Sequence, residues 1–177
     1  MDYTEKTLKT EEIFDGKVIR VSVDTVELPN GKTATRELVG HPGGVGIIAV
    51  TENRQVYMVR QYRRPFDESV LEVPAGKLEY GEDPLSCGIR ELGEEAGVTA
   101  KSMQHIGDYY VSPGFCREVI HLYLATDLTP VKQHLDEDEF LDVLMYDLDE
   151  LVDMVMNNQI HDAKTAIAIL KAKSILK

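Results

Sequence analysis

Residues 76–98 of the chain read GKLEYGEDPLSCGIRELGEEAGV, and this stretch decides the fold and the chemistry that we expect. A helix over residues 82–97 is predicted because both of its ends are marked. Asp83 can cap the first turn, Pro84 fits the first helical position, and Gly97 favours a stop at the C-terminal end.

The predicted helix has two opposite faces. One is an apolar stripe that would pack on the rest of the protein, formed by Leu85, Ile89, Leu92 and Ala96. The other carries the carboxylates of Glu91, Glu94 and Glu95, which stand at i, i+3 and i+4. Like charges at this spacing repel, and Mg²⁺ or Mn²⁺ with oxygen ligands would neutralise them, while Arg90 could hold one carboxylate in place. A solvated acidic face without any ligand is the alternative interpretation.

Strands are predicted on both sides of this helix. A hairpin of residues 18–28 and 33–39 turns at Pro29-Asn30-Gly31, and later elements are strands at 45–50, 56–61, 70–73, 119–125 and 141–146 and helices at 150–156 and 163–175. This mixture favours an α/β sandwich. The chain breaks at residues 41–44, so we expect an N-terminal β region over 1–42 and a main domain over 43–177.

The charge balance narrows the class of partner. With 31 acidic against 19 basic residues the formal charge is -12, so nucleic acid and anionic membranes are not expected to bind. A small phosphorylated substrate would need a cation between itself and the carboxylates. We find no signal peptide or membrane span and expect a cytoplasmic protein.

The two cysteines and the five histidines predict no further site. Cys87 and Cys116 form no CxxC pair, so reduced thiols are expected. The histidines show no metal-ligand spacing and are interpreted as surface or core residues; they are His41, His105, His121, His134 and His161.

The segment 76–98 resembles the Nudix box, in which Gly, Glu and a final Arg-Glu-apolar-x-Glu-Glu-x-Gly-apolar run stand at fixed spacing. Every defined position is filled, by Gly76, Glu82, Arg90, Glu91, Leu92, Glu94, Glu95, Gly97 and Val98. The resemblance implies a Nudix-like α/β/α sandwich with a mixed sheet, plus the N-terminal antiparallel hairpin region. It also implies hydrolysis of a diphosphate linked to a nucleoside.

The resemblance further implies a metal centre with two or three Mg²⁺ ions, or Mn²⁺. Carried over by position, Glu91 and Glu95 would be the core ligands and Glu94 would assist them. Glu82 would be a weaker, outer ligand, and the carbonyl of Ala75 a further one.

The flanks resemble the ADP-ribose pyrophosphatase branch of that family over nearly the whole chain. The matching segments are 36–37 with 41–43, 60–63, 72–77, 112–114 and 136–139. In that branch a proline at the place of Pro113, about 16 residues beyond Gly97, marks preference for ADP-ribose. We therefore expect substrate contacts from Arg36, Arg60, Arg63, Glu72, Pro113 and Gly114.

Two groups of charged residues are expected to take part in catalysis. Arg60, Arg63 and Arg64 form the densest basic cluster, and the resemblance implies that Arg63 binds the diphosphate. The acidic run 136–139 precedes a predicted strand. In similar enzymes a glutamate of this loop is the general base, for which Glu139 is the first choice and Glu137 the second. A merely solvated charge run is the alternative.

The resulting hypothesis is an Mg²⁺-dependent hydrolase that splits ADP-ribose into AMP and ribose 5-phosphate. Three alternatives remain: hydrolysis of another nucleoside diphosphate sugar, a non-catalytic domain that binds ADP-ribose, and a simple interaction domain. The N-terminal region resembles the dimerisation region of the branch, so a homodimer through residues 1–42 is expected.

Overall fold

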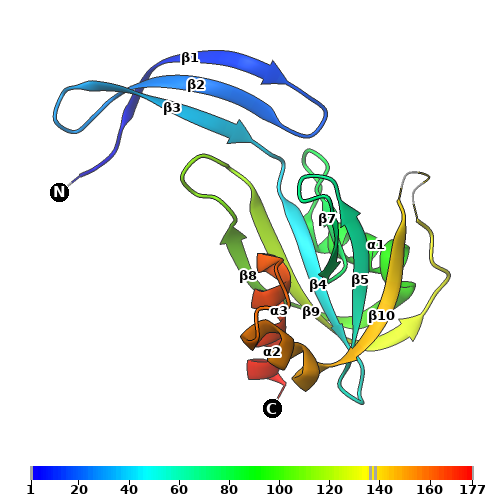
Figure 1. The fold of residues 1–177 in the computed structure, drawn as a ribbon. Helices are drawn as coiled ribbons and strands as arrows, with labels where there is room; N and C mark the ends of the chain where they lie inside the picture. The colour runs from blue at the N-terminus through cyan, green and yellow to red at the C-terminus, as the bar shows by residue number, and fades with distance from the viewer. Residues whose placement is uncertain (1, 136, 138, 177) are drawn as a thin grey trace. The chain divides into compact units, whose positions relative to one another are not determined.

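The computed structural model describes residues 2–135, 137 and 139–176 (Figure 1). In chain order its elements are β1 (Lys6–Asp15), β2 (Arg20–Glu27), β3 (Thr33–Gly40), β4 (Gly44–Val50), β5 (Gln55–Arg63), β6 (Glu68–Glu72), β7 (Ala75–Lys77), α1 (Pro84–Ala96), β8 (Val98–Tyr110), β9 (Val119–Pro130), β10 (Leu141–Asp147), α2 (Leu148–Met156) and α3 (Ala163–Ile175).

The chain divides into two compact units. Unit 1 comprises Met1–Gly43 together with Tyr110–Val119, and unit 2 comprises Gly44–Tyr109 together with Ile120–Lys177. The expected division into residues 1–42 and 43–177 stays a prediction, since unit 1 also takes a segment from the middle of the chain. The segment 110–119 comes from the middle of the chain, and nothing in the sequence assigns it to that region.

Unit 1 is built on an antiparallel sheet whose described strands lie in the order β1-β2-β3. The predicted hairpin forms β2 and β3, and Gly31 takes the positive φ of 78° that its turn requires. β1 is an addition that the sequence does not predict, since its residues are mostly charged or polar and all ten are exposed.

Backbone hydrogen bonds attach the segment 110–119 to β3. The Val39 amide donates to the Phe115 carbonyl at 2.8 Å, and the Arg117 amide donates to the Val39 carbonyl at 2.9 Å. The turn that contains Pro113 is closed by amides of Phe115 and Cys116, which donate to the Ser112 carbonyl. The Ser-Pro-Gly turn therefore folds with the N-terminal sheet.

Unit 2 contains a mixed sheet that has seven strands among the described residues. Its main order is β10-β5-β4-β9-β8, while β6 pairs with β5 and β7 pairs with β4. β4 and β9 run parallel, and β4 pairs antiparallel with both β5 and β7. The short β7 is not among the predicted strands, and its pairing with β4 brings Gly76 opposite Val45.

The central strand β4 is buried along its whole length and separates two cores. Ile48 and Val50 belong to a core shared with α2 and α3, whereas Val45, Ile47 and Ala49 belong to one shared with α1. This alternation puts helices on both faces of the sheet, as Figure 1 shows. The predicted α/β/α sandwich with a mixed sheet is confirmed.

The ends of α1 are as predicted, but its buried face is not. Asp83 caps the helix by accepting the Ser86 amide at 2.9 Å, and Gly97 ends it at a φ of 64°. The expected apolar stripe is wrong at Leu85 and Ile89, whose exposed fractions are 38% and 45%. The buried face consists of Cys87, Gly88, Glu91, Leu92, Glu95 and Ala96. Two of the carboxylates thus lie on the packed side of the helix rather than opposite to it.

The last helix, α3, is tied to the segment that leads into β7. The side chain of Thr165 is fully buried, and its hydroxyl accepts the amide of Val73 at 2.9 Å. Val73 precedes Pro74, whose carbonyl accepts the Ile47 amide at 2.8 Å. The connection between β6 and β7 is therefore fixed from both α3 and β4.

Two further expectations concern the thiols and the membrane. Both cysteines are free, with Cys87 buried and Cys116 half-buried. Within the described residues, no helix has the length and apolar character that a membrane crossing requires.

Candidate functional site

Two buried carboxylates form the centre of the site. Glu91 and Glu95 are exposed to only 7% and 2%, and both project from the inner side of α1. The Ala75 amide donates to Glu95 Oε2 at 2.8 Å. A Cβ atom added to Gly76 would overlap the carboxylate of Glu91, so only glycine leaves room for that side chain. Ala75, Gly76 and α1 therefore enclose the two acids.

Arg90 joins the remaining acids of the box to this pair. Its Nη1 donates to Glu91 Oε1 and to Glu94 Oε2, each at 2.8 Å, and its Nη2 lies 3.3 Å from Glu82 Oε1. The expectation that Arg90 holds a carboxylate in place is confirmed, and it holds three of them, those of Glu82, Glu91 and Glu94. Glu82 also accepts the Glu79 amide at 2.9 Å, so its position just before α1 is fixed.

Burial shifts the ionisation of the two inner acids. Removal from water raises the pKa of Glu95 to about 8, and the nearby negative charges of Glu91 and Glu139 add to the effect. The pKa of Glu91 is raised for the same first reason, with Glu94 and Glu139 contributing, although Arg90 opposes the shift. The negative charge of Glu139 thus acts on both inner acids.

The donor set fits a hard divalent cation. Carboxylate oxygens are the ligands that Mg²⁺ and Mn²⁺ prefer. Here Arg90 links the carboxylates of Glu82, Glu91 and Glu94, and the Ala75 amide binds that of Glu95. Burial, and after it the repulsion between neighbouring carboxylates, raises the pKa of Glu91 and Glu95, and a bound cation would favour their ionised forms. The predicted ligands Glu82, Glu91, Glu94, Glu95 and Ala75 are therefore gathered in one place.

Arg63 is held next to these acids by a buried glutamate. Its Nε and Nη2 donate to the two oxygens of Glu72 at 2.6 and 2.8 Å, a bidentate pair. Burial alone would raise the pKa of Glu72, but the hydrogen bonds and charges of Arg63 and Lys164 outweigh it and hold the pKa below its ordinary value. Glu95 is among the charges that raise the pKa of Arg63, after Glu72 and against burial.

Lys164 is a site residue that the sequence analysis misses. It lies near the start of α3, where its Nζ contacts Glu72 Oε2 at 2.5 Å and Asp162 Oδ2 at 3.1 Å. No local pattern marks it, because its partner stands 92 residues earlier in the chain. Glu72 thus neutralises two cations, and one of them is Arg63.

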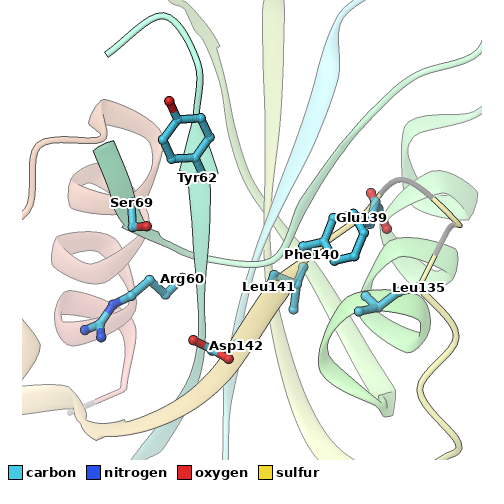
Figure 2. Close-up of a pocket in the computed structure, with 8 residues that line it drawn as sticks. All are labelled: Arg60, Tyr62, Ser69, Leu135, Glu139, Phe140, Leu141 and Asp142. Atoms are coloured by element: carbon cyan, nitrogen blue, oxygen red, sulfur yellow. The ribbon is translucent and has the colours of Figure 1, made fainter. Parts of the chain in front are cut away.

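An open groove of about 400 Å³ lies beside the predicted general base (Figure 2). Its lining residues come from β5, β6 and the path into β10; they are Arg60, Tyr62, Ser69, Leu135, Glu139, Phe140, Leu141 and Asp142. Figure 2 shows Glu139 next to Phe140 just before β10. Glu137 is exposed, and Asp136 and Asp138 lie outside the described residues.

The other arginines of the basic cluster have different surroundings. Arg60 lines the groove, where its Nη2 lies 3.5 Å from the Tyr146 hydroxyl. Arg64 pairs instead with the exposed Asp67 at 2.7 Å, the surface pairing that competes with a role in anion binding. Of the cluster, Arg63 has the strongest link to the buried acids.

The remaining predicted substrate contacts belong to unit 1. Arg36 is held in β3 by Glu5, with its Nε 2.9 Å from Glu5 Oε2. Pro113 and Gly114 form the turn that is bonded to Val39. Their predicted contacts with substrate stay predictions.

Comparison with known proteins gives matches over almost all of the chain. A family model described as the NUDIX domain matches residues 40–167, and one described as the nucleoside diphosphate sugar hydrolase N-terminal domain matches residues 5–39. The chain is 48% identical to an ADP-ribose pyrophosphatase from Bacillus subtilis, covering 93% of this chain and 90% of that protein. It is also 48% identical to a methanol dehydrogenase activator from Bacillus methanolicus, covering 94% and 91%.

A solved structure supports the fold. The crystal structure of an ADP compounds hydrolase superposes with a TM-score of 0.86 at 21% identity, covering 97% of this chain and 94% of that one. At this identity the match concerns the fold alone. It agrees with the sheet and helix arrangement described above.

The raised pKa of Glu95 predicts how the metal-free protein responds to pH. The unfolded chain ionises this group near 4.5 and the folded protein only near 8, so the folded state binds more protons between these values. The contribution of Glu95 to the free energy of unfolding is therefore fully present below about pH 4.5. The free energy of unfolding falls by about 2–4 kcal/mol as the pH rises to 8. Urea unfolding at a series of pH values, with excess metal chelator present, measures this free energy of unfolding.

The Glu95→Gln variant is the control, because it cannot ionise at this position. Its free energy of unfolding should fall clearly less over the same pH range than that of the unmodified protein. Equal losses in the two proteins would refute the assignment of the effect to Glu95. Saturating Mg²⁺ should reduce the loss in the unmodified protein only.

Proposed function

The chain belongs to the NUDIX domain family, and from this premise we propose that it hydrolyses the diphosphate bond of ADP-ribose to give AMP and ribose 5-phosphate. The observation that carries the proposal is the pair of buried carboxylates, Glu91 and Glu95, enclosed by Ala75 and Gly76 with Arg63 close by. The 48% identity to a protein named ADP-ribose pyrophosphatase supports the choice of substrate.

The cofactor in this proposal is Mg²⁺, or Mn²⁺, in two or three ions. Glu91 and Glu95 would hold them, with Glu94, Glu82 and the carbonyl of Ala75 as further ligands. Bound at this place, the metal would neutralise charge on the diphosphate and would lower the pKa of the attacking water. The oxygen-only donor set and the raised pKa values of the inner acids support this assignment.

Arg63 binds the diphosphate in the proposed mechanism. Two of its hydrogen bonds go to Glu72, and a guanidinium carries five N–H donors, so donors remain for a phosphate oxygen. Because Glu72 and Lys164 fix the guanidinium, it is held in place before substrate arrives, and little ordering is required on binding. Glu72 is a positioning residue for Arg63 in this arrangement.

Glu139 takes the proton from the attacking water. It lies close enough to Glu91 and Glu95 to raise the pKa of both, and it lines the groove next to β10. Glu137, the second choice, lies in the same loop and is exposed. Attack of the hydroxide on one phosphorus breaks the bond to the bridging oxygen, and AMP and ribose 5-phosphate leave. Arg60, which lines the same groove, and Arg36, Pro113 and Gly114 in unit 1 are proposed to contact the rest of the substrate.

A substrate panel tests the proposed function. Chromatographic product analysis would use ADP-ribose, ADP-glucose, GDP-mannose, NADH and diadenosine polyphosphates, each with and without Mg²⁺. We expect kcat/KM for ADP-ribose to exceed that for each other compound by about tenfold or more, with AMP as a product. No turnover is expected without a divalent cation.

The other outcomes separate the alternatives. A faster reaction with another nucleoside diphosphate sugar would keep the family chemistry and refute the substrate, which is relevant because a GDP-mannose pyrophosphatase from Yersinia enterocolitica is 30% identical over 78% of this chain. Calorimetric binding of ADP-ribose without any turnover would support a non-catalytic binding domain. If the protein neither hydrolyses nor binds any of these compounds, the interpretation as a simple interaction domain remains.

Replacement of the loop glutamates tests the general base. Glu139→Gln should lower kcat for ADP-ribose by about 10²–10⁴-fold with a small change in KM, because the proton acceptor is lost. The matched variant Glu137→Gln removes the same charge from the same loop and should change kcat by less than about threefold. The reverse order of the two effects would assign the role to Glu137.

We also propose that the protein is a homodimer formed through the N-terminal region, residues 1–42. Apolar side chains are exposed along β1, where Leu8, Ile13 and Phe14 have exposed fractions of 48%, 56% and 55%. Apolar residues that gather on one strand commonly mark a protein interface.

Light scattering tests the dimer. The expected mass is twice the chain mass of 19.9 kDa, and Ile13→Glu should shift the protein toward the monomer. Thr7→Glu adds the same charge at an exposed polar position of the same strand and should leave the dimer intact. A monomeric mass for the unmodified protein at micromolar concentration would contradict the proposal.

A further inference from the structure

Two histidines and an aspartate meet on the sheet of unit 2, away from the box. His105 and Asp108 belong to β8, and His121 belongs to the neighbouring strand β9. His105 Nε2 and His121 Nδ1 each lie 2.7 Å from the same atom, Asp108 Oδ1. One ligand atom from each residue lies within 4.8 Å of those of the other two. Among the described residues, this is the group of histidines and acidic residues whose ligand atoms lie close enough together to bind one metal ion.

An irregularity in β8 brings His105 and Asp108 to the same face of the sheet. Side chains alternate along a strand, so residues at i and i+3 such as His105 and Asp108 would point to opposite faces. Gly107 between them has a φ of 143°, which other residues rarely adopt, and it inserts one residue into the alternation. Ile106 and Tyr109 accordingly share the core next to α2 and α3, while His105 and Asp108 share the other face.

The third residue, His121, lies on β9 next to β8, and the parallel pairing of β4 and β9 shows which face of the sheet it occupies. His121 stands opposite Val45, whose side chain faces the core next to α1. Tyr123, two residues further along β9, therefore lies on the same face. Its ring centroid is 5.5 Å from that of His105, which limits the orientations of the imidazole. The backbone and this ring contact hold the group together.

The three side chains remain accessible to a dissolved ion. The exposed fractions of the side chains are 49% for His105, 50% for Asp108 and 23% for His121. Hydrogen bonding to His105, and then to His121, lowers the pKa of Asp108 although slight burial opposes this, so its carboxylate stays ionised. The formal charge of -12 also attracts cations to the protein.

We propose that His105, Asp108 and His121 form a binding site for a transition-metal dication such as Zn²⁺, separate from the carboxylate site on α1. Two imidazoles and one carboxylate are a donor set for Zn²⁺, Ni²⁺ or Cu²⁺, whereas Mg²⁺ prefers the oxygen-only set of α1. Three protein ligands leave a fourth position for water.

The present distances are close to those that such an ion needs. Zn²⁺ bonds to nitrogen and oxygen of about 2.0–2.2 Å place two tetrahedral ligands about 3.3–3.6 Å apart, so each 2.7 Å hydrogen bond must open by less than about 1 Å. The ion takes the place of the two hydrogen bonds that join these nitrogens to Asp108. His105 must then carry its proton on Nδ1 and His121 on Nε2. Binding links the edge strand β8 to β9.

Titration of the metal-free protein with ZnCl₂ tests the site. Calorimetry and competition with a chromophoric chelator would count the bound ions at pH 7.5. The unmodified protein should bind one more Zn²⁺ than His121→Gln or Asp108→Asn. Glu95→Gln, which weakens the α1 site, should keep that ion, so a failure of the proposed function and a failure of this proposal are distinguishable.

A matched control and a second readout complete the design. His161→Gln removes a histidine outside the group, exposed over 70% of its side chain, and should bind as the unmodified protein does. Zn²⁺ at a hundredfold excess over its Kd should raise the Tm by about 5 °C or more, and His121→Gln should lose this shift.

Equal Zn²⁺ stoichiometry in the unmodified protein, His121→Gln and Asp108→Asn would overturn the proposal. If His121→Gln fails to fold by circular dichroism, His105→Gln replaces it, since the side chain of His105 is half exposed. Loss of one ion in that variant supports the site, and retention of the ion refutes it.

Discussion

Glu91 and Glu95 place two carboxyl groups on the packed side of α1, and several contacts of unit 2 offset the free energy that their burial costs. Burial of an ionised carboxylate is unfavourable, and here it raises the pKa of both groups. Arg90 binds Glu91, the Ala75 amide binds Glu95, and Gly76 leaves the necessary space. These contacts offset the cost of burial only in part, so the pKa of both acids stays raised. A bound cation would offset the rest.

A second buried charge links the C-terminal helix to the same place. Glu72 is almost fully buried, and it is stable there because Arg63 and Lys164 both bind it. Thr165, the next residue of α3, binds the amide of Val73. The ionic contact and the neutral one together fix the strand end that leads to Ala75, so α3 supports the site without reaching its centre.

The sequence predicts those parts of the molecule that depend on neighbours in the chain. The helix with its caps at Asp83 and Gly97, the hairpin of β2 and β3, and the buried strand β4 all follow from local patterns. The inner face of α1 does not follow from a local pattern, because a search for a periodic apolar stripe treats Glu91 and Glu95 as polar positions. Their burial is possible only through partners in the tertiary structure. Lys164 and the meeting of His105 with His121 depend on contacts between distant segments, and β8 mixes polar and apolar residues without regular alternation. The bulge at Gly107 leaves no sequence signal beyond the glycine itself.

The contact between Lys164 and Glu72 also bears on how the protein is made. During synthesis the ribosome adds Glu72 early and Lys164 92 residues later, so a nascent chain holds this glutamate without one of its two cations. The same chain lacks the Thr165 hydroxyl that fixes Val73. The arrangement of Arg63 and Ala75 is thus completed only when α3 leaves the exit tunnel and docks on the sheet. A nascent chain that ends before α3 therefore carries the complete box without the support that Lys164 and Thr165 give to the strand end leading into it.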